Sequence, residues 1–178
     1  AGSLAEGPER PLWDIPPPDP EFGAAAQGFA WLDDLAVLGT TEARRKAQAW
    51  TWDWIARFGA GRGPGWMPDL IGRRIIRWVH HATFLMAGRS KSETEAFYRS
   101  LARQSAFLSR RWQAAAPGLP RIEALTGLVY AGLSLIGSQG LIAPASAALA
   151  RACATEVDEG GGIASRNPED LLELLTMI

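Results

Sequence analysis

The stretch TTEARRKAQAWTWDWIARFG, residues 40–59, decides the fold class. It opens with threonines that can cap a helix and closes with Gly59, a common helix terminator. Trp50 and Trp54 are four residues apart and share one helix face, whereas Trp52 points largely away. We expect a helix with Trp50 and Trp54 in the core. Trp52 then either packs on a neighbouring helix or offers its flat face to a ligand.

Working outward, similar signals divide the rest of the chain into helices. No segment alternates with a period of two, and the connections are short, which favours antiparallel helical hairpins in an all-α fold. The expected helices are one from an Asp19 cap to Gly39, one over 69–87, one from a Ser92–Glu95 capping box to about 115, one over 121–137, one from Pro144 to the glycine run at 160–162, and one after an Asn167 cap.

The chain has 178 residues, which fits one domain. Residues 1–20 are predicted to form an extended proline-rich arm, with Trp13 and Ile15 free to pack on the body, and 21–178 the helical domain. The formal net charge of −1 argues against a bulk nucleic-acid or anionic-membrane binder and leaves a local basic stripe open. No run approaches the roughly 18 apolar residues of a membrane span. No signal peptide is visible, so periplasmic and cytoplasmic locations both stay open.

Few residues offer catalytic chemistry. Cys153 is the single cysteine and lies in an alanine-rich stretch, where a small buried thiol is the default interpretation. His80 and His81 are adjacent and project about 100° apart on a helix, so they do not easily bind one metal. One of them could serve as an acid or base, although a helix-surface histidine is the simpler interpretation. We expect no metal site and no cofactor.

A cluster of arginines stands out on the helix expected over 69–87. Arg73, Arg74 and Arg77 surround an Ile-Ile pair at helical spacing. They either lie in solvent and pair with acidic residues such as Asp33, or they bind carboxylates or sulfates through their guanidinium forks.

Two loops add further candidate binding residues. Trp66 lies in a loop rich in glycine and proline and could present its ring to a sugar. Asn167 follows Arg166 in the turn after the glycine run, and capping of the last helix would fully explain it. The glycine run lacks the Gly-Lys-Ser/Thr ending of a phosphate loop, so nucleotide binding is not expected.

Several of these segments together resemble a known family. The order GFAWLDDL (28–35), WTWDWI (50–55), GWMP (65–68) and RRIIRW (73–78) is similar to the N-terminal region of heparinase II/III-type polysaccharide lyases. The resemblance continues through LVYAG (128–132) and the turn at 160–168. It implies that the hairpins form part of an incomplete (α/α) toroid, followed in a longer protein by a β-rich domain.

The resemblance also implies a function. Such lyases cleave acidic polysaccharides by β-elimination, in which a neutralised uronate loses its C5 proton to a base. The substrate-binding residues implied here are Trp66, Arg73, Arg74, Arg77, Arg166 and Asn167. An acidic polysaccharide, either a glycosaminoglycan or another uronate polymer, is then the expected partner.

Three positions depart from the family pattern. Leu119, Ile163 and Ser165 stand where the family commonly has asparagine, histidine and glutamate. We therefore assign no catalytic residue and expect this helical portion to be inactive alone. The alternative is a non-catalytic helical module that binds a glycan or a protein partner.

A final expectation concerns the end of the sequence, where a helical pattern is still running. Its leucines would pack on a following helix, and we expect self-association through this last helix if that helix is missing. These leucines are Leu171, Leu172, Leu174 and Leu175.

Overall fold

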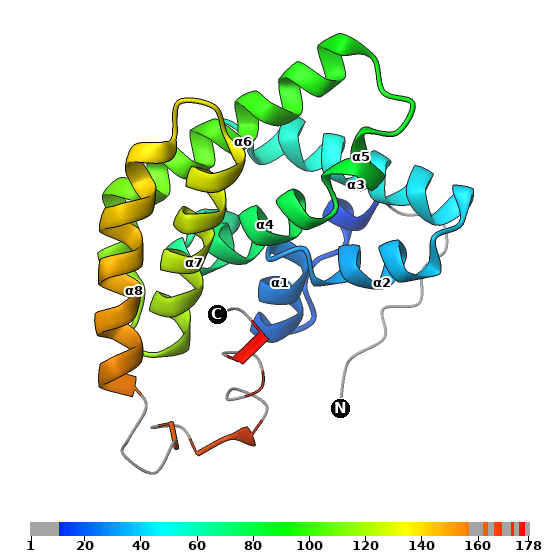
Figure 1. The fold of residues 1–178 in the computed structure, drawn as a ribbon. Coiled ribbons are helices and arrows are strands. Elements are labelled where there is room, and N and C mark those ends of the chain that lie inside the picture. The colour runs from blue at the N-terminus through cyan, green and yellow to red at the C-terminus, as the bar shows by residue number, and fades with distance from the viewer. Residues whose placement is uncertain (1–10, 157–161, 164–165, 169–171, 173–174, 177–178) are drawn as a thin grey trace.

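The computed structural model describes residues 11–156, 162–163, 166–168, 172 and 175–176 (Figure 1). Eight α-helices account for most of these residues, which confirms the all-α prediction. They are α1 (Pro20–Gln27), α2 (Ala30–Leu38), α3 (Thr41–Phe58), α4 (Pro68–His80), α5 (Ala82–Met86), α6 (Lys91–Arg111), α7 (Leu119–Ser134) and α8 (Ile142–Glu156). Short 3-10 helices lie at Leu12–Asp14, Pro64–Trp66, Trp112–Ala114 and Gln139–Leu141.

Two of the expected helix starts rest on the predicted side-chain caps. The Asp19 carboxylate accepts a hydrogen bond from the backbone N–H of Phe22, with Pro20 at the first helical position. The Thr40 hydroxyl accepts one from the backbone N–H of Ala43, and α3 ends before Gly59 as expected. Both caps join residues only three positions apart, and both form in the folded chain as the sequence predicts.

The single helix expected between Asp19 and Gly39 is wrong, because the chain breaks after α1. Phe29 adopts a left-handed conformation with φ of 65° and is fully buried. Its ring contacts Trp31, Trp54 and Trp78, at centroid separations between 4.7 and 5.9 Å. Trp13 also packs on this ring, and burial among four tryptophans offsets the backbone strain, which costs on the order of 1 kcal/mol.

Two other boundaries differ from the predictions. The helix expected over 69–87 is interrupted at His81, which separates α4 from α5. The capping box of α6 is Ser90 with Glu93, two residues before the predicted pair. Both pairs fit the Ser-x-x-Glu pattern, but Arg89 donates to Glu93 and to Gln48 of α3, which fixes the earlier start.

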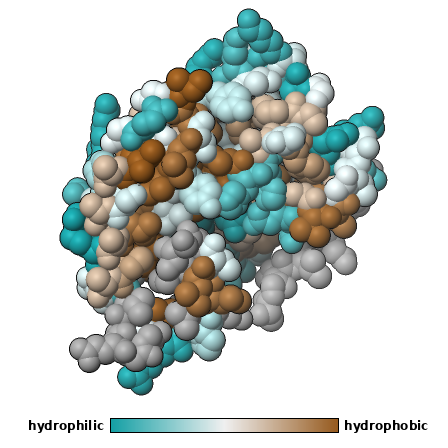
Figure 2. All heavy atoms as spheres, in the orientation of Figure 1, coloured by the Kyte–Doolittle hydropathy of each residue, from teal (hydrophilic) through white to brown (hydrophobic). Residues whose placement is uncertain are grey.

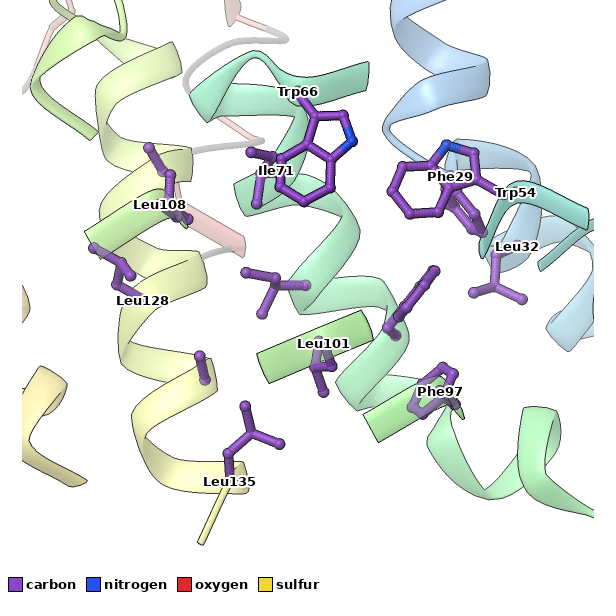
Figure 3. Close-up of a cluster of buried hydrophobic side chains, with 14 of the residues drawn as sticks. Phe29, Leu32, Trp54, Trp66, Ile71, Phe97, Leu101, Leu108, Leu128 and Leu135 are labelled. Atoms are coloured by element: carbon purple, nitrogen blue, oxygen red, sulfur yellow. The ribbon is translucent and has the colours of Figure 1, made fainter. Parts of the chain in front are cut away.

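The helices are arranged around α4. Figure 3 shows core side chains from α2 and α3 on one side of α4 and from α7 on the other, while α6 crosses α4, with its Phe97 and Leu108 toward opposite sides. The α4–α7 crossing is close because Gly72 and Gly127 face each other there. The pairs α2–α3 and α7–α8 are antiparallel hairpins (Figure 1). This packing does not by itself define a toroid.

The proline-rich arm is attached to the helical body in its described part. The Trp13 indole N–H donates to the backbone carbonyl of Trp50, at 2.8 Å. The Asp14 carboxylate pairs with Arg57 of α3. The division at residue 20 stays a prediction, and residues 1–10 lie outside the described part.

The outer surface carries apolar side chains at several places. Figure 2 shows apolar residues gathered near the tip between α7 and α8, where Leu133 and Ile136 are 68% and 101% exposed. Leu172 and Leu175 are also exposed, whereas Leu171 and Leu174 lie outside the described residues. None of the helices in the described part of the chain is long and apolar enough to span a membrane.

Candidate functional site

The predicted binding residue Arg74 lies in the centre of the protein and is fully buried. Its guanidinium donates to the Gln104 side chain at 2.6 Å and to the carbonyls of Gln27 at 2.7 Å and Gly65 at 2.9 Å. It also lies 4.0 Å from the ring centroid of Trp54. Burial lowers the pKa of Arg74 to about 9, so the group stays cationic at neutral pH. Its hydrogen bonds tie α1, α6 and the loop before α4 together.

Trp66 is also an interior residue, with 7% of its surface exposed. Its indole N–H donates to the Phe58 carbonyl at 2.8 Å, and its ring packs against Phe107 and Trp54. The ring face is therefore occupied by protein. Trp52 stacks on Phe97 of α6, which agrees with the first of the two interpretations given above.

Arg73 and Arg77 are partly buried, and each meets a carboxylate. Arg73 pairs with Glu123 of α7. Arg77 donates to Asp33 at 2.7 Å and to the Gly28 carbonyl at 3.0 Å. Pairing with Asp33 was one of the two interpretations offered for these arginines. Both guanidinium groups are engaged in joining α4 to its neighbours α2 and α7.

The two histidines continue this polar surface of α4. His81 lies 2.8 Å from Asp33, so this carboxylate joins Arg77 and His81. His80 lies 3.0 Å from the Tyr130 hydroxyl of α7. We name Asp33, Arg77, His80, His81 and Tyr130 the polar cluster. Within the described residues, no group of three or more His, Cys, Asp or Glu side chains is placed to hold a metal ion.

The last two predicted residues, Arg166 and Asn167, are exposed in the turn before Pro168. Arg166 adopts φ of 51°, in the left-handed region. Ile163 of the same turn is 9% exposed and belongs to a small core with Ile122 of α7. Ser165 and the glycines at 160 and 161 lie outside the described residues.

Cys153 contributes to that same small core. Its side chain is half-buried against α7, and burial raises the pKa of its thiol. A thiol in this state is protonated at neutral pH and is a poor nucleophile. This placement agrees with the default interpretation of a packing cysteine.

The structure adds a groove that the sequence did not reveal. We name it the arm groove; its volume is about 610 Å³, which is within the range of ligand pockets. Residues of the arm, α1 and the segments around Phe58 and Leu70 line it, so its walls come from four separate parts of the sequence. Its lining is mostly apolar and includes Trp13, Ile15, Pro18, Phe22, Phe58 and Pro64.

Comparison with known proteins gives one informative relative. The chain is 34% identical over 176 residues to FtsZ-localized protein C from Caulobacter vibrioides (strain NA1000 / CB15N). The match covers 98% of this chain and 30% of that protein, so the chain spans about a third of its relative's length. No model of a known protein family and no solved structure matches the chain.

This relative corrects the predicted family. The name of the matched protein points to FtsZ and not to polysaccharide cleavage, and the match covers the same residues that suggested a heparinase II/III-type lyase. The predictions of a polysaccharide lyase, of β-elimination and of an acidic polysaccharide or glycosaminoglycan partner are therefore wrong. The structure gives a physical reason, because Trp54, Trp66 and Arg74 of the shared pattern are core residues.

Proposed function

We propose that this chain is a helical unit of an FtsZ-associated cell-division protein and that it binds a protein partner. The similarity over nearly the whole chain to FtsZ-localized protein C is the observation that carries the proposal. FtsZ itself is the first partner to test. The finer arrangement of the helices, as part of an incomplete (α/α) toroid, remains a separate proposal.

Within this unit, the arm groove is the surface best suited to a polypeptide partner. Its lining includes the aromatic rings of Trp13, Phe22 and Phe58, and aromatic-lined grooves are surfaces on which extended peptides dock in other proteins. Pro18 and Pro64 are exposed, and Ile15 and Phe22 are half-buried, so apolar groups remain accessible to a partner. By contrast, Trp66 and Arg74 are buried and contribute to packing. An apolar segment of FtsZ is the occupant that we propose.

The test is a substitution in the groove that spares the fold. Pro18→Glu places a charge on an exposed lining residue of the arm, outside the helices. We expect the variant protein, in its full natural form, to co-pellet with FtsZ polymers several-fold less and to lose its co-localisation with FtsZ in cells. The matched control is Val37→Glu, because Val37 is 87% exposed and lies at the end of α2, away from the groove lining.

The result can also contradict the proposal in two separable ways. If the unmodified protein neither co-pellets nor co-localises with FtsZ, the proposed partner is wrong. If Pro18→Glu and Val37→Glu both bind as the unmodified protein does, FtsZ is a partner but the arm groove is not its site.

A further inference from the structure

We propose that one face of α6 binds an acidic polypeptide segment. This basic surface, which we name the arginine stripe, consists of Arg99, Arg103 and Arg110 on one face of α6, Arg111 at the end of α6 and Arg62 of the loop between α3 and α4. This inference does not rest on the arm groove or on FtsZ as partner. It rests on the concentration of basic residues, without acidic partners, on this part of the molecule.

The stripe is free of acidic residues over a long stretch of sequence. Between Glu95 and Glu123 the chain has five arginines and no aspartate or glutamate. The loop between α3 and α4, residues 59–67, likewise contains Arg62 and no acidic residue. Because the whole chain has a net charge of −1, this basic surface is a local excess that the rest of the protein balances elsewhere.

Helical geometry gathers the arginines of α6 on its solvent side. Phe97, Leu101 and Leu108 of this helix are buried in the core. Arg99 and Arg103 are exposed and four residues apart, so they share one face, and Arg110 follows two turns later. Figure 1 draws α6 along the upper edge of the molecule, and Figure 2 shows hydrophilic residues at that edge.

A hydrogen bond brings the loop arginine beside the helix. Arg103 donates from Nη1 to the carbonyl of Gly59 at 2.7 Å. Gly59 begins the loop that contains Arg62, so this loop starts beside Arg103 of α6.

The charges of the stripe are not neutralised by the protein in its described residues. There, the ion pairs of basic side chains with carboxylates involve Arg57, Arg73, Arg77, Arg89, Lys91 and His81. None of these pairs includes an arginine of the stripe. The five guanidinium groups therefore lack a carboxylate partner among the described residues, and only Arg103 uses one N–H on a backbone carbonyl.

The shape of the stripe fits an extended acidic peptide. Arg99 and Arg110 are separated along the helix axis by roughly 16 Å, the length of about five residues of extended chain. Between them, Ala102 and Ala106 are also exposed, and their small side chains do not protrude from this surface. Guanidinium forks bind carboxylates in two-point contacts.

Two other polyanions fit less well. A protein that makes about six to ten phosphate contacts to nucleic acid uses more cations than the five of this stripe, and a long polyanion would meet the acidic remainder of the protein. An anionic membrane would favour large apolar side chains for insertion beside the basic ones, and on α6 Tyr98, 42% exposed, is the large apolar side chain that reaches the surface.

The probe is a fluorescein-labelled peptide of twelve residues, mostly glutamate, followed by anisotropy at low salt. The variant Arg99→Glu/Arg110→Glu reverses two charges of the stripe, and we expect its Kd to rise at least about tenfold. The matched control is Arg44→Glu/Arg45→Glu on α3, which changes the net charge equally, and we expect its Kd to change less than about threefold. Pro18→Glu in the arm groove should bind the peptide normally.

Several outcomes would overturn the inference. One is an equal loss in the α3 control, which would mean that only net charge matters. Another is tighter stripe-dependent binding of single-stranded DNA, or of phosphatidylglycerol vesicles, than of the peptide. Absence of saturable peptide binding by the full protein would also reject it. The charge-neutral variant Arg99→Gln/Arg110→Gln, checked by circular dichroism, separates loss of binding from loss of fold.

Discussion

Gly72 and Gly127 meet where α4 crosses α7, and a Cβ atom added to Gly127 would lie 2.6 Å from the Gly72 Cα. Added to Gly72, it would collide with the backbone of Glu123. The obstacles are backbone atoms, which cannot rotate away. We therefore expect Gly72→Ala and Gly127→Ala each to lower the free energy of unfolding by about 1–3 kcal/mol in urea denaturation. Gly140→Ala is the control, since nothing lies within 4 Å of its added Cβ, and it should change stability little.

The stability of the fold should require an arginine at position 74, and not only a positive charge there. Arg74→Lys keeps the charge but cannot reach Gln27, Gly65 and Gln104 together, and it leaves buried polar groups without partners. We expect a loss of about 3–5 kcal/mol in the free energy of unfolding. Thermal unfolding followed by tryptophan fluorescence measures this loss of stability. The fluorescence reports on the site because the Arg74 guanidinium lies over the ring of Trp54. Arg45→Lys, at an exposed site on α3, should leave the transition unchanged; equal stability of the two variants would exclude the structural role.

The capping box of α6 should make the stability of the protein depend on pH. Hydrogen bonds from the Ser90 hydroxyl and backbone N–H, and then from Arg89, lower the pKa of Glu93 from 4.5 to about 2. A depressed pKa in the folded state stabilises the protein above pH 4.5, and this contribution is lost as the pH falls from 4.5 through about 2. Glu93→Gln should therefore be less stable than the unmodified protein at pH 6, and the gap should narrow below pH 4.5. A carboxyl midpoint near 4.5 in an NMR titration would contradict the prediction.

The attachment of the arm to the helical body should depend on one hydrogen bond of Trp13. Trp13→Phe keeps an aromatic ring against Phe29 and Phe58 but removes the N–H that donates to the Trp50 carbonyl. We expect a loss of about 1 kcal/mol and faster amide exchange in residues 12–20 than in the unmodified protein. Trp50→Phe offers the comparison, because it keeps the accepting backbone carbonyl. Unchanged exchange in Trp13→Phe would show that ring packing and the Asp14–Arg57 pair hold the arm without this hydrogen bond.

The helical class was predictable because its signals are short-range. Asp19 and Thr40 cap their helices through contacts three residues away, and Gly59 ends α3, all within one turn of the chain. The break at Phe29 was not predictable in this way. The reason for its left-handed backbone is the fit of the ring against Trp54 and Trp78, which the chain brings near only on folding.

The candidate site was harder to predict for a related reason. Arginine is most often a surface residue, so the burial of Arg74 depends on distant partners that sequence spacing does not show. The arm groove likewise needs Trp13, Phe58 and Leu70 together. Agreement with a lyase pattern at Trp54, Trp66 and Arg74 described packing and not chemistry, which is why it misled the functional prediction.

The central position of α4 has a consequence for the order of events during synthesis. The partners of Arg74 lie at residues 27, 65 and 104, and Gly72 is covered by α7. A nascent chain that has emerged only to the end of α4 would thus hold the Arg74 guanidinium without its partner Gln104 and a face of α4 that α7 does not yet cover. Cooperative folding must wait until α7 has left the ribosome, and chains stalled before that point should be targets for chaperones and proteases.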